Sequence, residues 1–209
     1  MWFWSSVLTV RPEAVISKWE QNAEEINQAL AVQMIARLKQ SIAINPLDAN
    51  SHLLIARYYE ALTNNEPTAK LSQFSELAEQ EYKSAIKHQP SWDYAWGKLA
   101  NFYSNQPELN KSAFMYTLSK AMLLGPYERK NQQILIPLIF KHWQLIANNK
   151  QEQAQATKII KHALKYSTHV HLTLNSAKKY QQLTTLAPLI TKKWHKNRLK
   201  KYLREAAND

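Results

Sequence analysis

The sequence predicts an all-α protein made of stacked antiparallel helix pairs, and three observations favour this fold class. Only two glycines, Gly97 and Gly125, occur among the 209 residues, which leaves few positions for the positive-φ turns of hairpin-rich sheets. Leu, Ala, Lys, Gln and Glu are abundant, and these residues lose little side-chain freedom in a helix. Pro46, Pro90 and Pro126 each follow an apolar stretch of helical period, which indicates a repeat.

The stretch before each of these prolines has the pattern of the second helix of a tetratricopeptide unit. A small residue stands five positions before each proline: Ser41, Ala85 and Ala121. Three and seven positions before each small residue stands another small or core-type residue, namely Leu38 and Met34, Tyr82 and Ala78, and Leu118 and Phe114.

The first helix of the unit is predicted by counting forward from each proline. After Pro90, the sequence matches the W-x₂-L-G-x₂-Y pattern, with Trp96, Leu99, Ala100 and Tyr103 at its Trp, Leu, small-residue and Tyr positions. Behind Pro46 the match is His52, Ile55, Ala56 and Tyr59, and an earlier degenerate version has Trp19, Ala23 and Ile26. Two helices approach closely only where a small side chain lies at their crossing. The prediction is a TPR-like helical-hairpin solenoid of about three to four units with a C-terminal basic helix.

Behind Pro126 the pattern weakens but stays helical. Residues 132–147 and 153–166 are predicted as a further pair, with Ala156, Ile160 and Ala163 in the second-helix places. Pro137 should kink the first of them or delay its start. Residues 168–185 are predicted as another first helix.

The last helix is predicted over residues 186–207, with cations on one side and apolar residues on the other. The basic face comprises Lys193, Lys196, Lys200, Lys201 and Arg204. The apolar side comprises Ile190, Trp194, Leu199, Tyr202 and Leu203. A solvated capping helix and a lipid- or polyanion-binding helix are both open interpretations.

The chain is therefore divided into an apolar segment (residues 1–12), a helical repeat domain (13–185) and a basic amphipathic helix (186–209). The first ten residues are about half the length that a bilayer-spanning helix needs, roughly 20 residues. They are interpreted as the end of a truncated membrane anchor, as an interfacial aromatic segment or as a helix end packed on the core.

Charge is distributed unevenly along the chain, whose formal net charge is +11. Residues 1–90 contain 8 Lys/Arg and 10 Asp/Glu, whereas residues 91–209 contain 19 and 6. No acidic residue occurs between Glu152 and Glu205. Such a field attracts phosphates, acidic polysaccharide or anionic lipid.

Motifs that would indicate an enzyme are weak or missing, so no catalytic, cofactor-binding or metal-binding residue is predicted. The absence of cysteine excludes thiolate chemistry, and two isolated glycines exclude a P-loop and a dinucleotide fingerprint. His162, His169 and His171 lack neighbouring acidic ligands, and residues 176–179 fit Ser-x-x-Lys without its supporting motifs. A binding surface is predicted instead in the groove lined by the first helices. Its candidates are Asn50, Leu53, Arg57, Tyr94, Asn101 and Ser104.

From about Trp19 to Ile146 the chain resembles the VpsP-type (Vibrio-polysaccharide P) tetratricopeptide-like proteins of bacterial exopolysaccharide biosynthesis clusters. The resemblance rests on residues 89–100 (Gln-Pro-Ser-Trp-Asp-Tyr-Ala-Trp-Gly-Lys-Leu-Ala), on residues 123–128 (Leu-Leu-Gly-Pro-Tyr-Glu) and on Trp143. It implies a helical protein anchored in the inner membrane on the periplasmic side, with an assembly role and no assigned chemistry.

The expected function is therefore a non-enzymatic scaffold without cofactors that binds other polysaccharide-assembly proteins, with anionic lipid or polysaccharide as further contacts. The alternative is a basic helical protein that binds nucleic acid or another polyanion through its C-terminal half, nucleic acid being the less expected partner. A third, weaker hypothesis is an enzyme whose catalytic residues do not form a known sequence motif.

Overall fold

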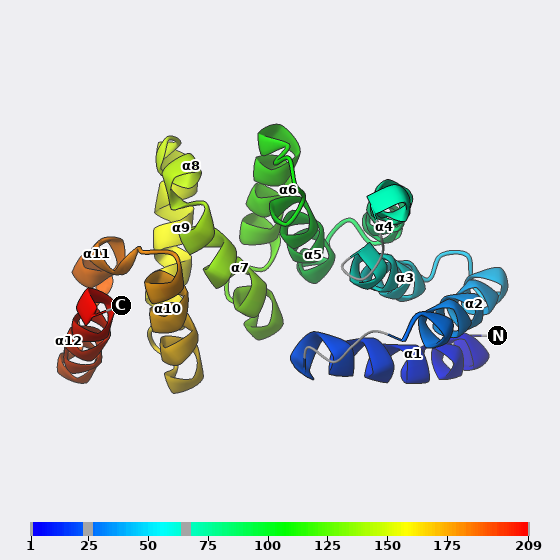
Figure 1. Ribbon diagram of the computed structural model, residues 1–209, viewed down its shortest axis with the longest axis horizontal. Helices are drawn as coiled ribbons and strands as arrows, with labels where there is room; N and C mark the ends of the chain where they lie inside the picture. Colours follow the sequence, from blue (N-terminus) through cyan, green and yellow to red (C-terminus); the bar gives the residue numbers. More distant parts are fainter. Residues whose placement is uncertain (1, 23–26, 64–67, 209) are drawn as a thin grey trace. The chain divides into compact units, whose positions relative to one another are not determined.

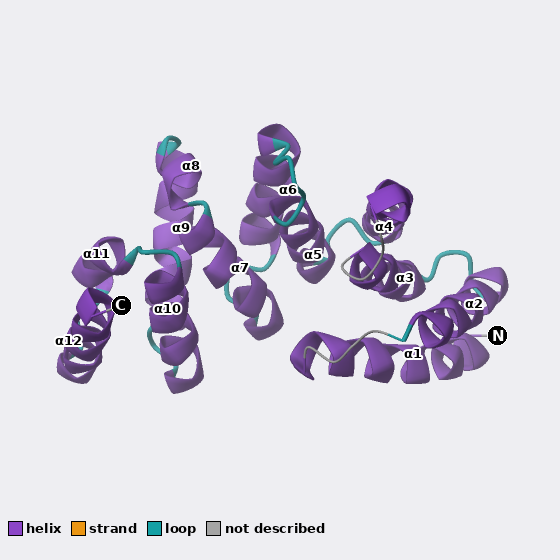
Figure 2. Ribbon diagram, viewed as in Figure 1, coloured by secondary structure: helices purple, strands orange, loops and turns teal. Residues whose placement is uncertain are grey.

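The computed structural model describes residues 2–22, 27–63 and 68–208, and throughout these ranges it contains helices and no strand (Figures 1 and 2). The all-α class predicted from composition is thus confirmed. The chain divides into two compact units, an N-terminal unit (Met1–Ala95) and a C-terminal unit (Trp96–Asp209). The boundary between the units lies between Ala95 and Trp96, within the predicted repeat domain.

In its described residues, the N-terminal unit comprises four helices and the beginning of a fifth (Figure 1). They are α1 (Trp2–Asn22), α2 (Gln28–Ile44), α3 (Ala49–Thr63), α4 (Thr68–His88) and α5 (Asp93–Ser104). Helix α1 packs on α2 and α3, α2 also packs on α3, and α3 packs along α4. Because α3 has neighbours on several sides, none of its residues is exposed.

The C-terminal unit holds the rest of α5 and the helices that follow (Figure 1). These are α6 (Lys111–Leu124), α7 (Arg129–Lys141), α8 (Trp143–Ala147), α9 (Lys150–Ala163), α10 (Ser167–Lys179), α11 (Leu183–Leu186), a 3₁₀ turn (Ala187–Leu189) and α12 (Lys193–Asn208). Helices α6, α7 and α9 pack on one another, α10 packs on α7 and α9, and α12 packs on α10.

The small residues predicted at helix crossings are buried. Ala56, Ala85, Ala100 and Ala121 are each 0% exposed, as a close approach of two helices requires. The aromatic partners Trp96 and Tyr103 are buried as well. In the C-terminal unit, the Trp96 ring meets Tyr116 of α6 edge-on, with centroids 5.7 Å apart. Ala23 and Ile26 of the degenerate first unit lie outside the described residues.

Local signals in the sequence explain where several helices begin and end. Asn27, Asn110 and Asn149 each cap a helix, because their side-chain oxygens accept backbone N–H groups that have no partner within the helix. The three prolines of the repeat each stand at the second of the four residues of the turn that follows a second helix. Pro is favoured there because its fixed φ suits that position of a turn.

Three predicted helices are interrupted in the structure. The helix predicted over residues 168–185 ends at Lys179, Gln181 has a positive φ of 56°, and α11 begins only at Leu183. The helix predicted over residues 132–147 begins earlier, at Arg129, so Pro137 does not delay its start. It breaks at His142, and α8 begins at Trp143. The helix predicted over residues 186–207 is split, because Ile190 is extended and α12 begins only at Lys193. Pro188 has no backbone N–H with which to continue the helix there.

Residues 2–12 of the predicted apolar segment lie in α1, which continues to Asn22 with Pro12 inside it. Pro12 leaves the carbonyl of Leu8 without its usual partner. Arg37 of α2 fills this gap, because its Nε donates to the Leu8 oxygen at 3.1 Å. The tertiary contact therefore compensates for the proline.

Candidate functional site

The six groove candidates differ in exposure. Leu53, Arg57 and Ser104 are buried, whereas Asn50, Tyr94 and Asn101 are half-buried. The prediction that all six line an open surface is therefore wrong for the first three. Asn50 and Tyr94 lie in the N-terminal unit and Asn101 in the C-terminal unit.

Arg57 is covered by α1. Its Nε and one terminal nitrogen bind the two carboxylate oxygens of Glu20 at 3.0 and 2.7 Å, and the same terminal nitrogen donates to Ser17 Oγ at 3.3 Å. Burial lowers the pKa of Arg57, but the hydrogen bonds and charge of Glu20 outweigh burial and hold it above its ordinary value. The guanidinium is thus satisfied within the chain.

Two tyrosines beside Arg57 are also committed to internal contacts. The hydroxyl of Tyr58 donates to the Pro12 carbonyl oxygen at 2.7 Å, and the hydroxyl of Tyr82 donates to the Glu60 carboxylate. Burial raises the pKa of both tyrosines, and the negative charge of Glu60 adds to the effect at Tyr82. Both hydroxyls are therefore neutral donors at physiological pH and join α3 to α1 and α4.

Ser104 lies against His142, with 2.7 Å between Ser104 Oγ and His142 Nε2. A hydroxyl at this distance from an imidazole is the geometry of a nucleophile and its base. Burial, followed by the charge of Lys141, lowers the pKa of His142 to about 4. Such a weak base suits proton abstraction near neutral pH poorly. Lys141 Nζ also donates to the Ser104 carbonyl at 2.8 Å, so the group joins α5 to the α7–α8 break.

Sequence analysis missed this serine–histidine contact, because residues 38 positions apart give no periodic signal. It also missed a stack of rings on the C-terminal unit, in which His162 lies between Tyr127 and Tyr166 with centroid distances of 4.2 and 5.1 Å. The buried Gln132 side chain donates to His162 Nδ1 at 3.0 Å and orients the ring. The i, i+4 spacing of His162 and Tyr166 was the available clue.

The three histidines considered above as metal ligands, His162, His169 and His171, lie in different surroundings. His169 is buried, and His171 is exposed with its Nε2 2.8 Å from Arg198. Burial and the charges of Lys165 and His169 lower the pKa of His162. Across the described part of the chain, no three His, Asp or Glu side chains come together as metal ligands would.

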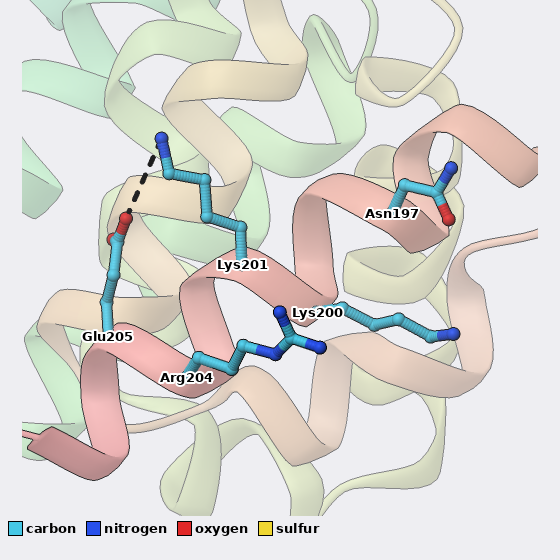
Figure 3. Close-up of a pocket in the computed structure, with 5 residues that line it drawn as sticks. All are labelled: Asn197, Lys200, Lys201, Arg204 and Glu205. Atoms are coloured by element: carbon cyan, nitrogen blue, oxygen red, sulfur yellow. Dashed lines mark ion pairs between the residues drawn. The ribbon is translucent and has the colours of Figure 1, made fainter.

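The five candidates of the basic face, in contrast, are all exposed on α12. Lys200, Lys201 and Arg204 line a shallow depression together with Asn197 and Glu205, as Figure 3 shows. In that view the Lys201 amine points to the Glu205 carboxylate, at 3.9 Å, while Lys200 and Arg204 extend away from it. The structure thus brings three of the five predicted cations together in one depression.

The apolar side predicted for α12 is partly wrong. Leu199 is buried, but Trp194 and Leu203 are 43% and 39% exposed, and His195 is buried in their stead. Ile190 is buried but precedes the helix. The sector of α12 that packs on α10 is therefore centred on His195 and Leu199.

Helices long and apolar enough to cross a bilayer are not found within the described residues. The side chains of residues 2–6 are outside the description, so the aromatic start of α1 is placed only as helix. The chain matches no protein-family model, no curated protein and no solved structure.

Proposed function

We propose that this chain is a non-enzymatic, tetratricopeptide-like scaffold that binds a partner protein within a cell-envelope exopolysaccharide assembly system, on the periplasmic side of the inner membrane. The burial of Ala56, Ala85, Ala100 and Ala121 carries the proposal. The spacing of the repeat alone predicts these alanines at helix crossings, and the same spacing is typical of tetratricopeptide scaffolds. The pathway rests on the resemblance carried by residues 89–100 and 123–128.

Polar groups of α3 and α4 support a structural role for these two helices. Arg57, Tyr58 and Tyr82 are bound to side chains or backbone of neighbouring helices. The serine–histidine contact has a histidine pKa of about 4, which is a poor match for a general base at neutral pH. Among the six groove candidates, Asn50, Tyr94 and Asn101 are the half-buried ones, and we assign the contact with the partner to their surface.

Site-specific photo-crosslinking in the source organism tests the proposal. A photoreactive amino acid is placed singly at positions 50, 94 and 101, and in matched controls at the exposed Lys39, Lys87 and Lys111, which lie on second helices. We expect one protein of the polysaccharide assembly system, identified by mass spectrometry, to be captured from first-helix positions only. Equal capture from the control positions, or capture of a protein of an unrelated system, would refute the proposed function.

Loss of the gene provides the second arm of the test. Under the proposal, deletion reduces surface polysaccharide, and a variant in which Ala100 is replaced by Leu fails to restore it, because the larger side chain cannot fit the crossing. An unchanged amount of surface polysaccharide in the deletion strain would contradict the assigned pathway. The scaffold function would then be tested by the crosslinking result alone.

A further inference from the structure

Helix α12 presents an unbalanced charge to solvent. Its exposed cations are Lys193, Lys196, Lys200, Lys201 and Arg204, and its one acidic side chain over residues 193–205 is Glu205. The Glu205 carboxylate is shared, since it lies 3.6 Å from Lys178 of α10 and 3.9 Å from Lys201. Most of the positive charge on this face is therefore available to an external anion.

The orientation of this face is fixed by contacts on the opposite side of the helix. His195 and Leu199 are buried towards α10. Tyr202 donates from its hydroxyl to Asn175 Oδ1 at 2.6 Å, and Arg198 lies 2.8 Å from His171 Nε2. The cations are consequently held outward together, as the sticks in Figure 3 show for Lys200 and Arg204.

Exposed apolar side chains flank the cations on both sides. On a helical wheel, Trp194 and Leu203 lie at opposite borders of the basic face, one near each end of the helix, and they are 43% and 39% exposed. One face of the Trp194 ring is covered by the Arg198 guanidinium, 5.0 Å from the centroid. The His195 ring also lies beside the indole, with centroids 3.8 Å apart, so Trp194 is held in place while 43% of it remains exposed.

This combination favours a lipid surface over a nucleic acid. Lysines beside an exposed tryptophan and leucine are typical of helices that lie in a bilayer interface, where the cations meet phosphate headgroups and the apolar groups meet the acyl boundary. A single-stranded nucleic acid would need free aromatic faces on which bases stack. One face of the Trp194 ring is instead covered by Arg198, and Tyr202 is held against α10 by the hydrogen bond of its hydroxyl to Asn175.

We propose that the exposed face of α12 binds the phosphate headgroups of an anionic membrane, with Trp194 and Leu203 in the headgroup layer. This contact does not require the proposed scaffold function, because it involves no protein partner. It would hold the C-terminal unit at a membrane surface without a spanning helix.

Vesicle flotation with the full chain tests the proposal. The probes are phosphatidylcholine vesicles with and without phosphatidylglycerol, at moderate salt. We expect binding only to the anionic vesicles. Replacing Lys196, Lys200 and Arg204 by Glu should weaken it at least about 100-fold, since each cation contributes about fivefold. Replacing the same three residues by Gln should weaken it less, in proportion to the smaller change in charge.

The matched control replaces Lys39, Lys87 and Lys111 by Glu. All three are exposed and lie outside α12, so this variant has the same net charge as the first and should retain most of its vesicle binding. Circular dichroism checks that each variant is folded. An equal loss of vesicle binding in the control would overturn the proposal, because the net charge of the whole protein, and not the face of α12, would then account for the binding.

A second variant separates lipid from other phosphates. The double replacement Trp194→Ser and Leu203→Ser should reduce vesicle binding about tenfold and leave binding to duplex DNA unchanged. Tighter binding to DNA than to anionic vesicles at equal phosphate, with no effect of the double replacement on vesicles, would overturn the lipid assignment and favour a nucleic acid. Binding to phosphatidylcholine alone would overturn it as well.

Discussion

The guanidinium of Arg37 donates to the carbonyl oxygen of Leu8, with 3.1 Å between Nε and O. Leu8 stands four residues before Pro12, which lacks the N–H that would otherwise bind this carbonyl. A second, longer bond of 3.4 Å joins Arg37 to the Val7 oxygen. An arginine of α2 thus satisfies the backbone group that a proline leaves open in α1.

Replacing Arg37 by Met should lower the free energy of unfolding by about 1–2 kcal/mol, because a charged donor to a partly buried carbonyl is lost. Chemical denaturation measures this. In a Pro12→Ala background the Leu8 carbonyl regains an N–H partner, so the same Arg37 replacement should cost less. Equal costs in both backgrounds would show that Arg37 acts independently of the proline.

The ion pair of Arg57 with Glu20 should respond asymmetrically to removal of each partner. The Arg57 side chain is 5% exposed and that of Glu20 37%. Glu20→Ala leaves a buried cation without its counter-ion and should cost about 2–4 kcal/mol, whereas Arg57→Met leaves a carboxylate that water can reach and should cost about 1 kcal/mol. Urea denaturation compares the two, and a larger cost for Arg57→Met would contradict the burial argument.

Acid should destabilise the C-terminal unit through His142. Its folded-state pKa of about 4 lies below the ordinary value of 6.5, so the unfolded chain binds more protons between these values. The stability from the neutral imidazole is therefore complete above pH 6.5 and is lost as the pH falls towards 4, by about 1–2 kcal/mol after allowing for partial exposure.

Denaturation at several pH values checks this. His142→Gln keeps an acceptor for the Ser104 hydroxyl but does not titrate, so its stability should vary less with pH over that window. Parallel profiles for the wild-type chain and the variant would assign the acid sensitivity to other groups.

Gly97→Ala should destabilise the chain by about 1–3 kcal/mol, although alanine normally favours a helix by about 1 kcal/mol. A Cβ at Gly97 would lie 2.6 Å from Asn131 Oδ1. The Asn131 amide cannot easily move, because it is buried and donates to the carbonyls of Ala121 and Gly125 at 3.0 and 2.9 Å. Thermal unfolding measures the change. A higher melting temperature in the variant would mean that the Asn131 side chain moves aside without loss of stability.

Features that depend on neighbouring residues in the chain were predictable. The glycine-poor composition predicted helices, and the repeat register predicted that Ala56, Ala85, Ala100 and Ala121 are buried, as they are. The prolines of the repeat fall in the connecting turns. These outcomes follow from helical period and local backbone preference, which a single sequence contains.

Exposure of the groove candidates was not predictable in this way. The register places Arg57 on the side of its helix that faces the groove, yet Glu20 and Ser17 of α1 cover it. Ser104 is covered in the same manner by His142. Trp194 and Leu203 were likewise predicted on the apolar, packed side of α12, but they lie at its borders with the basic face, and α10 meets the sector centred on His195 and Leu199.

The helical class, the small residues at the crossings and the concentration of positive charge near the C-terminus could all be predicted from the sequence, because each depends on residue type and short-range spacing. Which polar side chains are bound by neighbouring helices, and which remain exposed, is set only by the packing of the helices. That choice depends on contacts between residues far apart in the chain, such as Arg37 with Leu8 and Arg57 with Glu20, whose partners no periodic pattern specifies.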